Sequence, residues 1–272
     1  MALAKKRELL YQLRPDIAVI PECSCDSMLA CIDDGFDACW WGKNKHKGLG
    51  VLAAKPWTLE SGLGAETRPS VSERRQVLQN QPRQNQPRQN RPRQKWIAPV
   101  RVHGPCDFLL LPVWACPVGK VREHNYVGQI FDAIVRHPEW FTREFPTVIC
   151  GDFNSNTIFD PGRKKKSHSS VVRLLAERGL TSVYHEFFSE NHGAETRPTY
   201  YFWHREERSF HIDYIFLPQM WMNRVVTCEV GAYQQWRPAS DHMPVVVDIT
   251  LDDAQTTARL GPTGVKSFRA AG

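Results

Sequence analysis

Residues 147–154 read TVICGDFN, a short run of β-branched and apolar residues that leads directly into a polar segment. The run Thr147–Cys150 predicts a buried β-strand. Asp152 and Asn154 follow at once, and the end of a strand is a place where a rigid sheet can aim polar groups into a cleft. Taken alone, GDFN is also compatible with a turn in which Asp152 and Asn154 bind their own backbone.

Three other segments have the same form, with an apolar run beside acidic or imidazole side chains. They are DIAVIPE at 16–22, HIDYIFL at 211–217 and SDHMPVVVDI at 240–249. Carboxylate oxygens gathered at strand ends suit a hard divalent cation such as Mg²⁺ or Mn²⁺. Taken singly, each segment has a simpler interpretation, as a solvated glutamate or a surface histidine in a loop.

In this order, PDIAVIPE, GDFN, IDYIF and SDHMPVVVDI resemble the motif series of the endonuclease/exonuclease/phosphatase superfamily, which includes deoxyribonuclease I. The resemblance extends from about Arg14 to Ile249, with residues 64–95 set aside. It implies an α/β (α+β) fold, a four-layered α/β/β/α sandwich of two packed mixed β-sheets with helices outside. It also implies metal-dependent hydrolysis of a phosphodiester or phosphomonoester by attack of water.

The resemblance assigns catalytic roles to four residues. Asp152 and Asn154 correspond to the pair that orients the attacking water and holds the phosphate. Asp213 corresponds to the aspartate that binds the catalytic histidine, here His242. An imidazolium at His242, kept charged by Asp213, can donate to a phosphate oxygen or, once neutral, accept a proton. Whether Asp152 or His242 is the base stays open.

The resemblance also implies a metal site and contacts to the substrate. Glu22 corresponds to the metal-binding glutamate, and Asp241 to a second acidic group near the Mg²⁺ or Mn²⁺ ion, which would stabilise charge on the phosphate. Asn154, which holds the phosphate, is one substrate contact. Trp114 stands on the strand where relatives place a phosphate-contacting tyrosine or histidine. His204, which follows a predicted strand over 199–203, is a further candidate for the cleft.

Two departures from the family pattern concern the N-terminal part of the chain. Pro21 stands where relatives commonly have glutamine, directly before Glu22. The family also begins with a strand that ends in Trp-Asn, and no such strand precedes the helix predicted over residues 3–13. Because that strand lies inside a sheet, its absence would leave its neighbours with unpaired backbone groups. We expect Met1 to be an internal methionine of a longer protein; the alternative is an impaired relative that acts as a nucleic-acid-binding protein.

The positive charge of the chain lies in one segment. Residues 64–95 carry seven arginines and one lysine against two glutamates, which equals the formal net charge of +6 of the whole chain. QNQPR at 79–83 recurs with a five-residue period, and its regular prolines and polar composition predict a disordered, low-complexity basic insertion. The alternative is a basic arm that grips phosphates. Otherwise 1–251 is predicted to be a single domain, and 252–272 a flexible C-terminal tail.

The composition excludes several classes of protein. Of the 272 residues, 42% are hydrophobic and 24% are charged, which is typical of a globular protein. No apolar run approaches the roughly 20 residues of a membrane helix. The first residues lack the features of a secretory signal, so we expect a cytoplasmic protein with reduced cysteines.

Cysteine spacing gives a third hypothesis, a zinc protein. Cys23, Cys25, Cys31 and Cys39 lie close in sequence but lack the paired C-x₂-C pattern of structural zinc sites, which favours free thiols. The expected partner is therefore a phosphoester substrate, with DNA and RNA among the candidates. We expect no membrane and no obligate protein partner.

Overall fold

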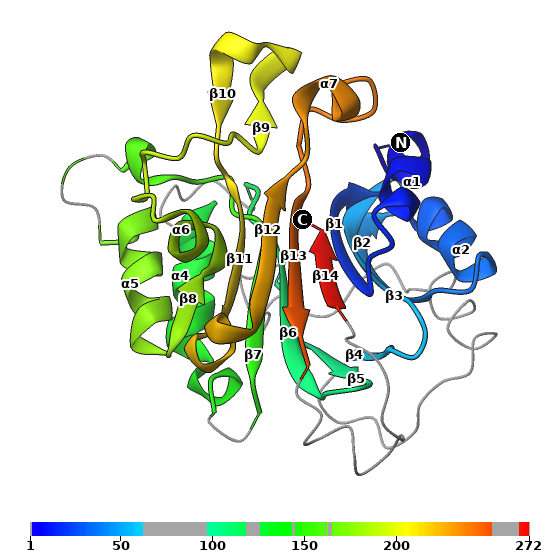
Figure 1. The fold of residues 1–272 in the computed structure, drawn as a ribbon, viewed down its shortest axis with the longest axis horizontal. Helices are drawn as coiled ribbons and strands as arrows, with labels where there is room; N and C mark the ends of the chain where they lie inside the picture. The colour runs from blue at the N-terminus through cyan, green and yellow to red at the C-terminus, as the bar shows by residue number, and fades with distance from the viewer. Residues whose placement is uncertain are drawn as a thin grey trace.

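The computed structural model describes residues 2–61, 97–117, 126–142, 145–160, 162, 165–251 and 267–271. Within this part of the chain, two six-stranded β-sheets pack face to face, and helices cover the outer face of each (Figure 1). The predicted four-layered α/β/β/α sandwich is confirmed.

The first sheet consists of β1 (Ile17–Cys23), β2 (Asp37–Asn44), β3 (Lys47–Ala53), β12 (Val225–Val230), β13 (Val245–Thr250) and β14 (Ser267–Ala271). The second consists of β4 (Thr58–Ser61), β5 (Val100–His103), β6 (Phe108–Trp114), β7 (Thr147–Asp152), β8 (Leu180–Ser182) and β11 (Asp213–Pro218). A separate ribbon is formed by β9 (Tyr200–Tyr201) and β10 (Ser209–Phe210). The helices are α1 (Ala2–Gln12), α2 (Cys25–Asp33), α4 (Val127–Arg136), α5 (His168–Glu177), α6 (Val183–Phe188) and α7 (Tyr233–Trp236).

The strand order is β12-β13-β14-β1-β3-β2 in the first sheet and β4-β5-β6-β7-β11-β8 in the second. In β1, Ile17 and Val19 pack in the core between the sheets, whereas Ala18 and Ile20 pack with α1 and α2. Successive side chains of a strand point to opposite faces, and both faces of these sheets are covered. Because both faces of such strands are buried, the apolar runs of the sequence are continuous and do not alternate with polar residues.

The segment Ser267–Ala271 lies inside the first sheet, where the sequence predicts a flexible tail. It forms β14, which pairs parallel with β1 and antiparallel with β13. The expectation of a flexible tail is therefore wrong for these residues, while 252–266 lie outside the described residues. Pairing on both sides accounts for the strand, because pairing and packing in a sheet outweigh a segment's own weak strand propensity. The unpaired neighbours expected around an absent strand are likewise not found, since β14 lies between β1 and β13.

Ending the chain after residue 266 is expected to destabilise the fold. The truncation removes the ladder on both sides of β14, at roughly 0.5–1.5 kcal/mol for each hydrogen bond. We expect the free energy of unfolding in urea to fall by about 3 kcal/mol or more. A chain that ends at residue 271 is the control, and an equal urea midpoint for the two truncations would contradict a structural role of β14.

The strands around the basic segment differ from expectation. From sequence, the apolar runs 48–54 and 97–102 on either side of the basic segment predict two strands of one hairpin, but β3 and β5 lie in different sheets, and β5 pairs with β4. The chain thus crosses between the sheets before the segment 64–95, which lies outside the described residues.

Two remaining expectations concern membranes and cysteines. No helix in the described ranges combines the length and apolar character that crossing a bilayer requires. All eight cysteines have free thiols. Among the described residues, no cysteine belongs to a cluster with metal-ligand spacing, so the cysteine zinc hypothesis has no geometric support.

Candidate active site

Two predicted catalytic carboxylates lie side by side in the second sheet. Asp152 is the last residue of β7, Asp213 is the first residue of β11, and the two are cross-strand partners. Asp152 is 2% exposed and Asp213 is 1% exposed. Antiparallel pairing aligns the end of one strand with the start of the next, so two motifs far apart in sequence meet at one buried point.

His242 lies in the loop before β13 and contacts this pair of strands. Its Nδ1 is 2.9 Å from Oδ2 of Asp213, and its backbone N–H donates to Ser240 Oγ at 3.0 Å. Burial alone would lower the pKa of His242, but the charge and hydrogen bond of the Asp213 carboxylate, together with the charges of Asp152 and Asp241, raise it to about 9. The imidazole is therefore held in one orientation and is charged at neutral pH.

Asn154 binds the carboxylate of Asp152. Its backbone N–H donates to Oδ1 at 2.7 Å, and its side-chain amide donates to Oδ2 at 2.5 Å. The chain turns back here through a φ of 45° at Asn154, a conformation that asparagine tolerates. Burial, followed by the Asp213 carboxylate, raises the pKa of Asp152. The local turn and the strand-end site, considered as alternatives from sequence, are thus the same structure.

Glu22 lies at an irregularity of β1, where its φ is 58°. Its half-exposed carboxylate contacts Lys47 on β3, with 2.9 Å between Oε1 and Nζ. The Glu22 carboxylate also contributes to the raised pKa of Asp152, so both belong to one electrostatic region. Sequence reasoning missed Lys47, because no motif marks a lysine on a neighbouring strand.

Trp114 is aligned with Asp152 in the parallel pair β6 and β7. Its side chain is nevertheless only 4% exposed and packs in the core between the sheets. The expectation that Trp114 contacts the substrate is corrected by this burial. Side-chain alternation along β6 decides which way the ring faces, and the motif position alone does not.

Asp241 and His204, which the sequence also predicts to lie near the substrate, line one open groove. The groove has a volume of about 550 Å³, and Lys5 and Arg237 lie along it as well. His204 is exposed and has a φ of 55°, because β9 ends at Tyr201 and the predicted strand over 199–203 breaks into a turn. Two basic side chains beside the catalytic loop make this groove suitable for an anionic ligand.

Lys6 is a site residue that sequence reasoning missed. It lies on α1 and lines a small cavity together with Ile20 and His242. Burial lowers the pKa of Lys6, while the carboxylates of Asp213, Asp241 and Glu22 oppose that shift. No sequence signal could have found Lys6, because only the packing of α1 on the first sheet brings it to these groups.

The β9–β10 ribbon projects beside α7 at the same end of the molecule (Figure 1). The ring of Tyr200 in this ribbon packs at a tilt against the ring of His242, with 4.6 Å between the centroids. Trp203, at the tip, is 64% exposed and has a φ of 58°. The guanidinium groups of Arg205 and Arg208 lie 5.8 Å and 5.3 Å from the centre of its ring.

The structure thus brings together Asp152, Asn154, Asp213 and His242, with Glu22 and Asp241 in the same electrostatic region. Among the described residues, no three of these side chains have ligand atoms within 4.8 Å of one another. The carboxylates therefore surround the site more loosely than a closed cage does.

The fold agrees with comparisons to known proteins. The model of the Endonuclease/Exonuclease/phosphatase family matches residues 7–242. The chain belongs to this family. A search of curated protein sequences found no match.

Solved structures of this family's fold resemble the chain over nearly its whole length. A 3′-5′ exonuclease (NExo) from Neisseria meningitidis has a TM-score of 0.57 and 17% identity, over 91% of this chain and 95% of its own. A 3′ phosphatase NExo from Neisseria, bound to a product DNA hairpin, has a TM-score of 0.59 and 17% identity, over 92% and 96%. An AP endonuclease from Archaeoglobus fulgidus has a TM-score of 0.59 and 15% identity, over 90% and 92%. At these identities the likeness establishes a shared fold.

Proposed function

We propose that this chain hydrolyses phosphoester bonds of a nucleic acid at the site formed by Asp152, Asp213 and His242. One observation carries the proposal, namely the hydrogen-bonded pair of Asp213 and His242 beside the buried carboxylate of Asp152. Such a site offers a cationic donor and a carboxylate acceptor on adjacent backbone elements. A member of the endonuclease/exonuclease/phosphatase family can use these two groups for attack of water on phosphorus.

In the proposed reaction, Asp152 accepts a proton from water while the water oxygen forms a bond to phosphorus. The bond from phosphorus to the leaving oxygen breaks in the same displacement. Burial, followed by the Asp213 carboxylate, raises the pKa of Asp152, which makes its carboxylate a stronger proton acceptor than an ordinary aspartate, and Asn154 holds that carboxylate in place. His242 is charged at neutral pH, so its part is to donate a hydrogen bond to a phosphate oxygen.

Glu22 and Asp241 are the residues that we propose to hold a divalent cation, Mg²⁺ or Mn²⁺. Their carboxylate oxygens are the donors that such ions prefer. The crowding of negative charge, which together with burial raises the pKa of Asp152, fits a cation at this position. A bound ion would stabilise negative charge on the phosphate. Lys47 contacts Oε1 of Glu22 in the structure, so a cation bound there would share this carboxylate with Lys47.

Support for a nucleic acid as the substrate comes from the surface around the site. The groove with Lys5 and Arg237 suits a phosphate backbone, and the exposed ring of Trp203 suits stacking with a base. The names of the similar structures, an exonuclease, an AP endonuclease and a phosphatase with a DNA hairpin, agree with this substrate class.

The test is hydrolysis of plasmid DNA, of labelled oligonucleotides with a 3′ phosphate or an abasic site, and of a small chromogenic phosphodiester. We expect turnover with Mg²⁺ or Mn²⁺ and none with EDTA. Hydrolysis that persists in EDTA would contradict the metal assignment. Folded protein that binds DNA but hydrolyses none of the substrates would favour the alternative of a nucleic-acid-binding relative.

Trp203→Ala is expected to weaken binding of nucleic acid and to spare the chemistry. Stacking of one base on an aromatic ring contributes about 1–3 kcal/mol, so we expect the KM for oligonucleotides to rise roughly tenfold. Turnover of the small phosphodiester should be unchanged. Met220→Ala is the matched control, since Met220 is 65% exposed and follows the far end of β11. Equal loss on both substrates would argue against a stacking role.

A further inference from the structure

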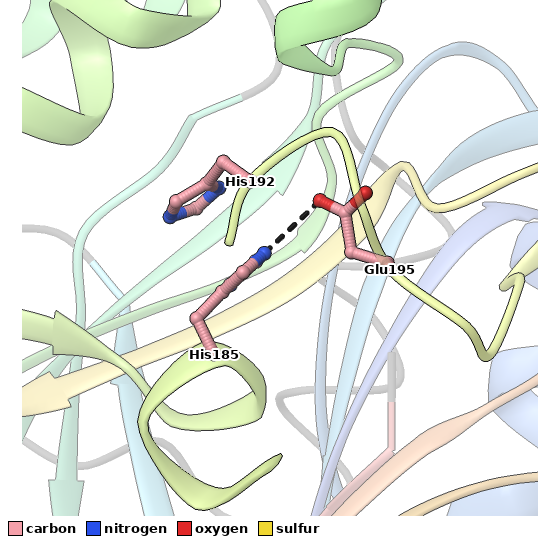
Figure 2. Close-up of side chains that lie close together, drawn as sticks. All are labelled: His185, His192 and Glu195. Carbon is pink, nitrogen blue, oxygen red and sulfur yellow. Dashed lines mark hydrogen bonds and ion pairs between the residues drawn. The ribbon is translucent and has the colours of Figure 1, made fainter. Parts of the chain in front are cut away.

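A second group of titratable side chains lies beside α6, apart from the site described above. His185 lies on α6, and His192 and Glu195 lie in the loop between α6 and β9 (Figure 2). The ligand atoms of these three residues all lie within 4.8 Å of one another. His185 Nε2 is 3.0 Å from Glu195 Oε1, and the rings of His185 and His192 stack with 3.4 Å between centroids.

Four of the ten histidines of the chain gather around this point. The rings of His168 and His211 lie 4.9 Å and 5.1 Å from the centroid of Tyr214, and those of His185 and His192 lie 6.0 Å and 6.1 Å from it. His168 and His211 are almost completely buried. So dense a group of imidazoles in the interior calls for a physical reason, because each carries two polar nitrogens.

Several of these nitrogens have no hydrogen-bond partner. In the described part of the chain, the buried unpaired side-chain nitrogens include His168 Nε2, His192 Nδ1 and His211 Nε2. Buried polar atoms in native proteins are nearly always paired, so three orphans in one cluster are exceptional. An ordinary hydrogen bond between His185 and Glu195 explains only one contact and leaves His192 Nδ1 without a partner.

The surrounding hydrogen bonds orient the cluster as an outer shell orients metal ligands. Ser182 Oγ lies 2.7 Å from His185 Nδ1, which directs Nε2 towards Glu195. Asn156 Nδ2 donates to Glu195 Oε1 at 3.0 Å, and the backbone N–H of Gly193 donates to Oε2 at 3.0 Å. A partner on the second imidazole nitrogen and donors to the carboxylate are the usual support of metal-binding residues.

We propose that His185, His192 and Glu195 bind a transition-metal ion of the zinc type. Two imidazoles and one carboxylate are a nitrogen-rich donor set that suits Zn²⁺ and does not suit Mg²⁺. Ligand atoms on a tetrahedral zinc ion, with bonds of about 2.0–2.1 Å, lie about 3.4 Å apart. His185 Nε2 and Glu195 Oε1, at 3.0 Å, are already close enough to share an ion, so it is the ligand atom of His192 that must approach them, with its ring turning out of the stack on His185.

The position of the cluster indicates what the ion does. Asn156, which binds Glu195, follows the catalytic segment at Asp152 and Asn154 and also donates to the backbone carbonyl of His211, at 2.9 Å. His211 lies two residues before Asp213. A zinc ion here ties the loop between α6 and β9 to the backbone that carries both catalytic aspartates, so its role is to position that backbone. It takes no part in the bonds to the phosphate.

The test is metal binding by the full chain, stripped with a chelator and then titrated with Zn²⁺. Native mass spectrometry and equilibrium dialysis with metal analysis are expected to show one ion per chain that excess Mg²⁺ does not displace. Zn²⁺ should raise the melting temperature, since it binds only the folded state. Co²⁺ in place of Zn²⁺ should give the intense visible absorption of a tetrahedral site without thiolate bands.

Two variants and two controls locate the ion. Changing an outer-shell partner weakens binding by roughly 10–100-fold, and loss of a ligand in His192→Gln or Glu195→Gln should cost at least that much. His137→Gln is the matched control, since His137 also contacts a carboxylate, Glu139 at 2.7 Å, but lacks a third ligand. Glu22→Gln should bind Zn²⁺ as the unaltered chain does, which separates this site from the phosphate site.

Four results would overturn the proposal. They are no binding of Zn²⁺ by the folded chain, unchanged affinity in both His192→Gln and Glu195→Gln, loss of binding in Glu22→Gln, and thiolate bands in the Co²⁺ spectrum. The Co²⁺ spectrum and the melting temperature are measured on the unaltered chain. The proposal can therefore still be refuted if one of the variants fails to fold. None of these measurements depends on hydrolysis, so the proposal stands or falls independently of the proposed function.

Discussion

Asp152→Asn is expected to lower kcat/KM for phosphoester hydrolysis by about 1,000-fold or more, because it removes the acceptor of the water proton. At 1.36 kcal/mol for each factor of ten, this is a loss of about 4 kcal/mol of transition-state stabilisation. Binding of DNA should persist or tighten, since one negative charge leaves the site. The measurements are steady-state kinetics and fluorescence anisotropy with a labelled oligonucleotide.

The fold should tolerate this change. Burial and the neighbouring Asp213 carboxylate raise the pKa of Asp152, so ionising this carboxyl costs more in the folded than in the unfolded chain, and replacing it with a neutral amide removes that cost. We therefore expect a melting temperature no lower than that of the unaltered chain. Asp107→Asn is the control. Asp107 lies directly before the start of β6, whereas Trp114, which pairs with Asp152, lies at the end of that strand. Equal kinetics for Asp152→Asn and Asp107→Asn would exclude Asp152 as the base.

His242→Gln is expected to reduce both hydrolysis and stability. Loss of the charged donor should lower kcat by a factor of about 10²–10⁴. The change also leaves the carboxylate of Asp213, which is 1% exposed, without its cationic partner. An unpaired buried charge costs roughly 3–5 kcal/mol, so urea unfolding should show a loss of that order.

The double variant Asp213→Asn with His242→Gln separates the two effects. Stability should recover, because no unpaired charge remains, while hydrolysis should stay as low as in His242→Gln. If the single and double variants are equally unstable, the charge pair does not account for the loss. If the double variant regains activity, His242 has no part in the chemistry.

The same pair predicts a pH dependence of stability. The pKa of His242 is raised from 6.5 to about 9 in the folded chain, so the pair stabilises the fold fully below pH 6.5. That contribution is lost as the pH rises towards 9. The difference in free energy of unfolding between the unaltered chain and the double variant should therefore shrink across this interval. A constant difference would show that Asp213 does not hold a proton on His242.

Local sequence was sufficient to locate the strand ends that carry the proposed catalytic residues. The apolar runs before Asp152 and around Asp213 are β-strands, and the polar residues lie at the ends of those strands. An unbroken run of apolar residues indicates a strand that is buried on both faces of a covered sheet. Where the run ends, the strand ends, and the next side chains can face solvent or a binding site. The motif order then indicated the family and its four layers before any tertiary contact was known.

Local sequence was insufficient for residues whose role depends on packing. Trp114 stands in register with Asp152, yet its ring faces the core. Ser267–Ala271 has no strong strand pattern of its own, yet it becomes β14 because two neighbours pair with it. Lys6 reaches Glu22, Asp213 and Asp241 only because α1 packs against the first sheet.

The sequence by itself determined that the runs beside Asp152 and Asp213 are strands, and which acidic and imidazole residues stand at the ends of those strands. Tertiary structure alone decided that Lys47 pairs with Glu22, and that His185, His192 and Glu195 converge. The physical reason is the range of the interactions. Alternation and turn chemistry act between residues a few positions apart, whereas these contacts depend on which strands pair and which side chains share a buried space.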